Sequence, residues 1–158
     1  MDDRTRYRQA LQAVEREAVE LPWADGRPWR VETHVWFESN LAVVDLHDLS
    51  AALARQVVRT VVSHPSDTGA VVFVHGHGTR LGASQVLRHL VRRELRSACD
   101  DHPGWTWRQS GGGRTIWISD PARAPAQATG DWGLGTQALF LALGAAAVVG
   151  LLNALGWL

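Results

Sequence analysis

The sequence predicts an α/β protein, a two-layer α/β sandwich of element order β-β-α-β-α-β-β with an N-terminal helix and a C-terminal transmembrane helix. Three observations favour this class. Strand-like apolar runs alternate with amphipathic helical patterns in residues 30–119, an amphipathic pattern precedes them, and an uncharged apolar stretch follows them. We therefore expect an N-terminal helix and connector (1–29), the α/β domain (30–119), a linker (120–137) and the membrane helix (138–158).

Composition and charge narrow the class further. The 158 residues suit one domain with appendages, and a hydrophobic content of 46% is too high for a disordered chain. The single cysteine, Cys99, excludes an internal disulfide framework and a CxxC zinc site. Residues 1–54 hold six arginines and ten acidic residues, whereas residues 55–131 hold ten and six. The zero net charge is thus compatible with a local basic surface.

The N-terminal segment is predicted to form a helix packed on the domain. Apolar side chains recur there at spacings of three and four, the period of one helix face, at Tyr7, Leu11, Val14, Ala18 and Leu21. Leu21-Pro22 ends the pattern, because the residue before a proline disfavours the α conformation. The segment has no apolar stretch of the kind found in a signal peptide, and we expect none to be present.

The strands and helices of the domain follow in order. Alternation over residues 31–37 predicts a half-buried strand, and the continuous apolar runs LAVVDL (41–46) and AVVFV (70–74) predict central strands. Between them an apolar stripe predicts a helix over 49–63, with Ser50 as its N-cap. The remaining expected elements are a helix over 83–99 and a strand pair, 105–108 and 114–119, around the glycines at 111–113.

The segment 138–158, ALFLALGAAAVVGLLNALGWL, contains no charged residue. At 1.5 Å per residue its 21 residues would span about 30 Å as a helix, the thickness of a bilayer core. The alternative is a buried core helix, although such helices are usually shorter and carry a polar stripe. We expect a single-pass, tail-anchored membrane protein with its N-terminal domain in the cytoplasm. The lipid bilayer is then a partner, and the small residues Ala146 and Gly150 suit helix pairing in a homo-oligomer.

Two short polar motifs follow the two predicted central strands. Asp45-Leu46-His47-Asp48 follows the first, and His75-Gly76-His77-Gly78 follows the second. The carboxyl ends of such strands are where α/β folds bind ligands. Glycines there let the backbone approach a phosphate and leave N–H groups free at the start of the next helix.

These motifs resemble those of the Smr (small MutS-related) domain family. The family has a DLHG-like strand end, an HGxG strand end and a helix with an LRxxV stretch. Here they are DLHDL at 45–49, HGHG at 75–78 and LRHLV at 87–91, and GGGRTIWI at 111–118 is similar to the closing strands. The resemblance covers about residues 40–120. Asp48 stands where the family has glycine, and His77 where lysine is frequent.

The resemblance implies nucleic-acid binding and, in some members, endonuclease activity without a tightly bound metal. His47 then acts as general base or acid in phosphodiester cleavage, Asp45 orients it, and His75 is the second member of the pair. DNA or RNA is the expected partner, and no cofactor is expected. The candidate nucleic-acid-binding residues are Gly76, His77, Gly78, Arg80, Arg88, Arg92 and Arg96. The last three form one stripe at i, i+4 and i+8 of a helix.

Three other functions remain open from the sequence. His47, His75 and His77 are three imidazoles that can in principle bind a metal, although the pattern is weak evidence. The second possibility is a non-catalytic nucleic-acid-binding module with the same surface. The third is a protein-interaction module that has lost nucleic-acid binding, which Asp48 would favour because its carboxylate repels phosphate.

Overall fold

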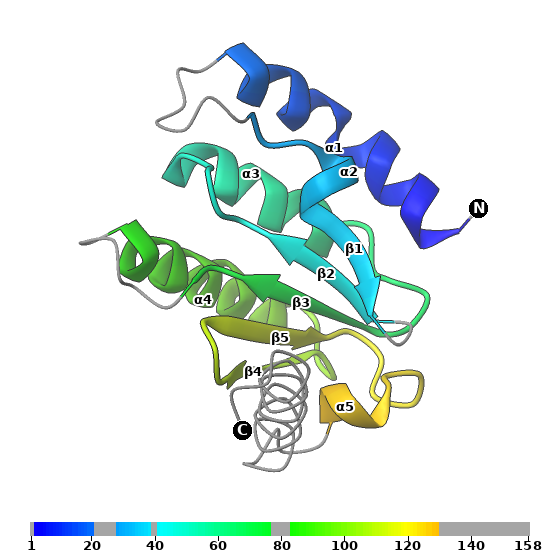
Figure 1. Cartoon of the computed structure of the whole chain (residues 1–158). Helices are drawn as coiled ribbons and strands as arrows, with labels where there is room; N and C mark the ends of the chain where they lie inside the picture. The colour runs from blue at the N-terminus through cyan, green and yellow to red at the C-terminus, as the bar shows by residue number, and fades with distance from the viewer. Residues whose placement is uncertain (1, 21–27, 39–40, 77–82, 130–158) are drawn as a thin grey trace, which may run out of the picture.

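A computed structural model describes residues 2–20, 28–38, 41–76 and 83–129, and the structural statements below refer to these residues. They form a mixed α/β fold with a five-stranded sheet, which confirms the α/β part of the predicted fold (Figure 1). In chain order the elements are α1 (Asp3–Glu20), α2 (Val31–His34), β1 (Val35–Glu38), β2 (Leu41–Asp45), α3 (Ala51–Val62), β3 (Ala70–Val74), α4 (Ala83–Asp101), β4 (Thr106–Ser110), β5 (Arg114–Ile118) and α5 (Ala126–Thr129).

The strand order in the sheet is β1-β2-β3-β5-β4. β2 and β3 are parallel, and every other neighbouring pair is antiparallel. The parallel pair is joined by α3, whose first turn is capped by Ser50, with the Leu53 N–H donating to Ser50 Oγ over 3.3 Å. The predicted cap is therefore confirmed. The continuous apolar runs that predicted β2 and β3 are buried almost along their full length.

The main core lies between one face of the sheet and the helices α1, α3 and α4, which all lie on that side (Figure 1). The sheet contributes side chains from alternate strand positions to this core: Ala42, Val44, Val71, Phe73 and Trp117. The intervening residues form a second apolar cluster on the other face: Leu41, Val43, Ala70, Val72, Ile116 and Ile118, together with Ala128 of α5.

Helix α1 is anchored at its start as well as by its apolar face. The buried carboxylate of Asp3 accepts hydrogen bonds from Ser66 Oγ and, over 3.0 Å, from the Asp67 N–H. The Arg6 guanidinium donates to the Asp67 carboxylate and to the Pro65 carbonyl. Tyr7, like the other apolar residues named for this helix up to Ala18, is buried in the main core. The predicted packing of this helix on the domain is confirmed.

The predicted strand at 31–37 was wrong over its first four residues, which form the helical turn α2. The cause is local, because the Arg30 carbonyl accepts from the N–H groups of Thr33 and His34 and the His34 ring lies against the Arg30 backbone. The first residues of the predicted linker also form regular structure. Asp120 caps a turn by accepting from the Ala122 N–H, and α5 follows.

No helix in the described part of the chain is long and apolar enough to cross a membrane. The predicted membrane helix, 138–158, and most of the linker lie outside the described residues. The domain boundaries and the localisation therefore stay predictions.

Candidate functional site

The two motifs meet because β2 and β3 are parallel neighbours. Asp45 and Val74 are register partners at the ends of these strands, and the Leu46 N–H donates to the Val74 carbonyl over 2.9 Å. The residues that follow each strand, His47 on one side and His75-Gly76 on the other, therefore lie at one edge of the sheet. The antiparallel β5 begins at the same edge, since Arg114 pairs with Val74.

Asp45 holds His47 in a defined orientation. One carboxylate oxygen, Oδ1, accepts a hydrogen bond from the His47 N–H over 2.9 Å and also bonds His47 Nδ1. Because Asp45 engages Nδ1, the other ring nitrogen, Nε2, is the one that faces Gly76. A Cβ atom placed on Gly76 would lie only 2.3 Å from His47 Nε2. In the neutral ring this arrangement favours the Nδ1–H tautomer, which leaves the lone pair on Nε2.

Two glycines make the contact between the strand end and the β4–β5 turn. Gly76 has a φ of 79° and Gly113 a φ of 68°, the left-handed region that favours glycine. A Cβ on Gly113 would lie 2.3 Å from the Gly76 carbonyl oxygen. The His75 N–H donates to the Gly113 carbonyl over 2.9 Å. The glycine-rich turn is therefore packed directly on the second motif.

His75 lies beneath this contact, with only 2% of its surface exposed. Its Nε2 is 3.0 Å from Thr115 Oγ1, while its Nδ1 is buried with no hydrogen-bond partner among the described residues. Burial lowers the pKa of His75 to about 4, against an opposing effect of the Gly76 backbone and with help from the positive charge of Arg88. A neutral ring at pH 7 that is held under the loop suits positioning rather than proton transfer to a substrate.

A cavity of about 290 Å³ opens beside His75 and Gly76. Arg88 of α4 lines it, together with Gln109, Ser110, Gly113 and Arg114 of the β4–β5 hairpin. Arg88 Nη2 donates to the neutral Gln109 amide over 3.0 Å, whereas Arg114 Nη1 lies 3.8 Å from the Glu38 carboxylate. The cavity thus offers one guanidinium with a neutral partner, a hydroxyl and glycine backbone, a combination suited to an anion.

The hairpin residues of the cavity were missed by the sequence analysis. Gln109, Ser110 and Arg114 flank the glycine-rich turn, which the sequence predicts as the centre of a strand pair and not as part of the site. Their position follows from a long-range pairing, β5 with β3, which no local pattern contains. The available signal was the run of three glycines, since such runs often let backbone approach another segment or a ligand closely.

The predicted arginine stripe of α4 is divided by the fold. Arg88 lines the cavity, whereas the Arg92 guanidinium lies over the Trp107 ring, 5.8 Å from its centroid, with its Nε buried. Arg96 is exposed, and eight residues of helix place it about 12 Å along the axis from Arg88. On the flank toward α3, Arg93 and the α3 arginines 55 and 59 converge on the Glu94 carboxylate at 2.8–3.3 Å.

Several predicted site residues lie outside the described residues: His77, Gly78 and Arg80. The three-histidine metal hypothesis depends on His77 and therefore stays a prediction. Among the residues that the structure does describe, no group of three or more His, Cys, Asp or Glu side chains is placed to hold a metal ion.

Asp48 has a φ of 65°, the only positive φ of a described residue other than glycine. Its carboxylate lies 4.0 Å from His34 Nε2 and is 40% exposed. The position therefore needs the conformation that glycine adopts most easily. The carboxylate lies one residue from His47 and lowers the positive potential of this edge.

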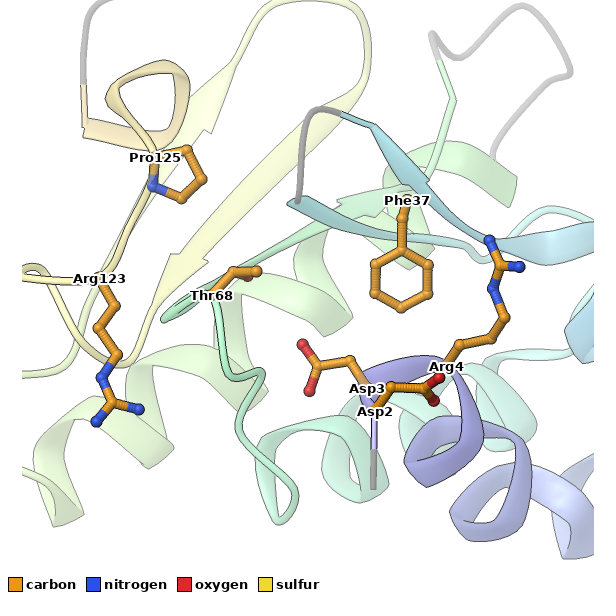
Figure 2. Close-up of a pocket in the computed structure, with 7 residues that line it drawn as sticks. All are labelled: Asp2, Asp3, Arg4, Phe37, Thr68, Arg123 and Pro125. Carbon is orange, nitrogen blue, oxygen red and sulfur yellow. The ribbon is translucent and has the colours of Figure 1, made fainter.

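A larger cavity, about 590 Å³, lies at the other edge of the sheet, where β1 ends and β3 begins. Figure 2 shows Phe37 above it, Asp2, Asp3 and Arg4 from the start of α1, and Arg123 and Pro125 opposite. Both carboxylates already have structural partners. Asp2 accepts from the Thr5 N–H over 2.7 Å, and Asp3 is part of the Ser66–Asp67 anchor. We therefore place the candidate site at the His47 edge.

No model of a known protein family matches the chain, and no similar chain is found among curated proteins or solved structures.

Proposed function

We propose that the His47 edge of the sheet binds the phosphates of a nucleic acid and cleaves a phosphodiester bond. The observation that carries the proposal is the pairing of Asp45 with His47 Nδ1, which directs Nε2 toward the glycine backbone at the rim of the Arg88 cavity. A histidine oriented by a carboxylate is a common general base, and a guanidinium in a part-enclosed cavity is a suitable phosphate ligand.

The proposed division of labour follows from the environments of the residues. His47 Nε2 takes the proton of the attacking hydroxyl or water as its oxygen bonds to phosphorus, and Asp45 stabilises the imidazolium that forms. The bond from phosphorus to the leaving oxygen breaks, and that oxygen takes its proton from solvent water. Arg88 and the Ser110 hydroxyl bind the phosphate oxygens, which gain negative charge in the transition state. Buried, neutral His75 fixes the loop through Thr115 and the Gly113 carbonyl. This assignment replaces the earlier acid role of His75 with a positioning role.

The second candidate is a non-catalytic module that binds nucleic acid or protein through the same edge. Two observations favour it. His75 is too buried to protonate a leaving group, and the Asp48 carboxylate lies next to His47. Attachment to a bilayer through 138–158, with pairing through Ala146 and Gly150, rests on the sequence alone and is the alternative to the arrangement proposed for this segment in the next subsection.

The catalytic proposal is tested by His47→Ala in the full chain, with plasmid nicking and RNA cleavage as the assays. We expect cleavage to fall by roughly 10²–10⁴, the usual contribution of a positioned general base, while most of the binding remains. His64→Ala is the matched control, because His64 is an exposed histidine at the other end of α3. Equal cleavage by wild type and His47→Ala would contradict the proposal, whereas binding without cleavage by wild type would favour the non-catalytic module.

Binding is tested separately by the salt dependence of affinity. Each phosphate contact contributes about 0.9 to the slope of log affinity against log salt for duplex DNA. Arg88→Gln should therefore reduce that slope by about one contact, and Arg16→Gln, at an exposed position of α1, should leave it unchanged. An unchanged slope for Arg88→Gln would remove the cavity from the binding surface.

A further inference from the structure

The second face of the sheet is apolar across its three central strands. Leu41 and Val43 of β2, Val72 of β3 and Ile116 and Ile118 of β5 are each no more than 6% exposed. Strands that are apolar on both faces are typical of sheets covered on both sides. Water on one side would instead favour alternating polar residues. This face therefore requires a cover.

The described residues supply little of that cover. The long helices α1, α3 and α4 all pack on the opposite face (Figure 1). In the described part of the chain, the apolar residues from outside the sheet that join this second cluster are Ala124 and Ala128. A four-residue helix such as α5 is about 6 Å long, whereas five strands at about 4.8 Å spacing make a sheet roughly 20 Å wide.

Helix α5 fixes the point from which the chain continues. Ala128 is fully buried in the second cluster, and its carbonyl accepts a hydrogen bond from Arg108 Nε of β4 over 2.9 Å. The Ala128 N–H donates to the Pro125 carbonyl over 2.7 Å. The following residues therefore start from the second face itself, and Trp132, only four residues after Ala128, is within about 14 Å of it.

We propose that the second face of the sheet is the docking surface of residues 132–158 of the same chain. This segment has 27 residues without a single charge, and the docking surface is apolar as well. About 14 residues of helix span the roughly 20 Å width of the sheet, so the segment is long enough to cover it. The short tether gives the segment a high effective concentration at its own sheet, which favours it over a second copy.

The same apolar segment cannot lie on the sheet and span a bilayer at once. Docking on the sheet is favoured because it also buries Val43, Val72 and Ile116, which insertion into a bilayer would leave without a cover. The inference does not depend on the phosphodiester proposal, since the docking surface and the His47 edge use different residues.

The test uses the full chain with the photoreactive residue benzoylphenylalanine in place of Phe140, a conservative change within the segment. The protein is irradiated in detergent-free buffer and with phosphatidylcholine vesicles, and the adducts are mapped by mass spectrometry. We expect monomer-sized products in which the probe at position 140 is joined to β2, β3 or β5. These products should be in at least tenfold excess over the same products from a probe placed at Val86. Val86 is the control because it is 52% exposed on α4, on the other side of the sheet.

Three outcomes overturn the inference. Adducts only to lipid, or a protein that precipitates in detergent-free buffer unless vesicles are present, would assign the segment to the bilayer. Dimer-sized adducts assign the face to a second copy. Monomer-sized adducts that map only to α1, α3 or α4 assign the segment elsewhere on the domain.

Discussion

The left-handed conformation of Asp48 makes a quantitative prediction that separates backbone strain from charge. At a φ of 65° an alanine keeps the steric conflict between its Cβ and the following carbonyl, which costs about 1–2 kcal/mol, and a glycine does not. We therefore expect Asp48→Gly to be more stable than Asp48→Ala by about 1 kcal/mol, after allowance for the greater freedom of glycine in the unfolded chain. In a chain of 158 residues this corresponds to a difference in Tm of about 2–4 °C.

The assay is urea unfolding of the two variants in the full chain, with the paired substitutions Gln56→Gly and Gln56→Ala as the control. Gln56 is exposed in the middle of helix α3, where alanine is favoured over glycine by about 1 kcal/mol. The order of stability should therefore reverse between the two sites. If the alanine variant is as stable as the glycine variant at position 48, the backbone-strain explanation is refuted.

Nucleic-acid binding should respond differently to the same two Asp48 variants. Both remove a carboxylate next to His47, so both should strengthen binding to a similar extent. If only Asp48→Gly strengthens binding, the conformation of the backbone matters for affinity rather than the charge. If neither does, the interaction-module hypothesis gains support.

Two further predictions concern His75 and Arg92. The pKa of His75 is about 4 in the folded chain and about 6.5 in the unfolded chain, so the unfolded chain binds the additional proton as the pH falls from 6.5 to 4, and stability is lost in that window. We expect the free energy of unfolding to fall by about 2 kcal/mol between pH 7 and pH 5 in wild type, and this loss should be absent in His75→Gln. An equal loss in that variant would refute the assignment. Arg92→Ala should destabilise the fold by about 1 kcal/mol in urea unfolding, because it removes the guanidinium from the Trp107 ring, whereas Arg96→Ala should be within about 0.5 kcal/mol of wild type; equal effects of the two would make Arg92 an ordinary surface residue.

The central strands and the first motif were predictable because their signals are local. LAVVDL and AVVFV are apolar without interruption, and that pattern predicts strands buried on both faces wherever they lie in the sheet. Asp45 and His47 are two residues apart, so the geometry of one turn decides their contact. The helical turn α2 shows the limit of such patterns. Its residues alternate like a strand, but the Arg30 carbonyl captures two backbone N–H groups.

The rest of the site depends on contacts between segments far apart in the sequence. Thr115 meets His75 across 40 residues of sequence. Burial lowers the pKa of His75 to about 4, so the ring is neutral at pH 7 and suits a positioning role rather than that of an acid. Ser110 and Gln109 enter the cavity only because β5 pairs with β3. The arginines at i, i+4 and i+8 of α4 form one stripe in the sequence, but the fold gives each of them a different environment. The middle one, Arg92, lies over the Trp107 ring of β4.

The same reasoning links the sheet to the apolar C-terminal segment. Hydropathy alone favours the bilayer for 138–158 over a buried core helix, because it considers the residues of the segment and not the surfaces available to them. The two continuous apolar strand runs already imply a second covered face, and among the described helices only α5 contributes a residue to that face. A long apolar segment and an apolar sheet face in one chain are therefore complementary signals. Taken alone, the apolar segment predicts a membrane anchor, and the apolar sheet face predicts a partner that covers it.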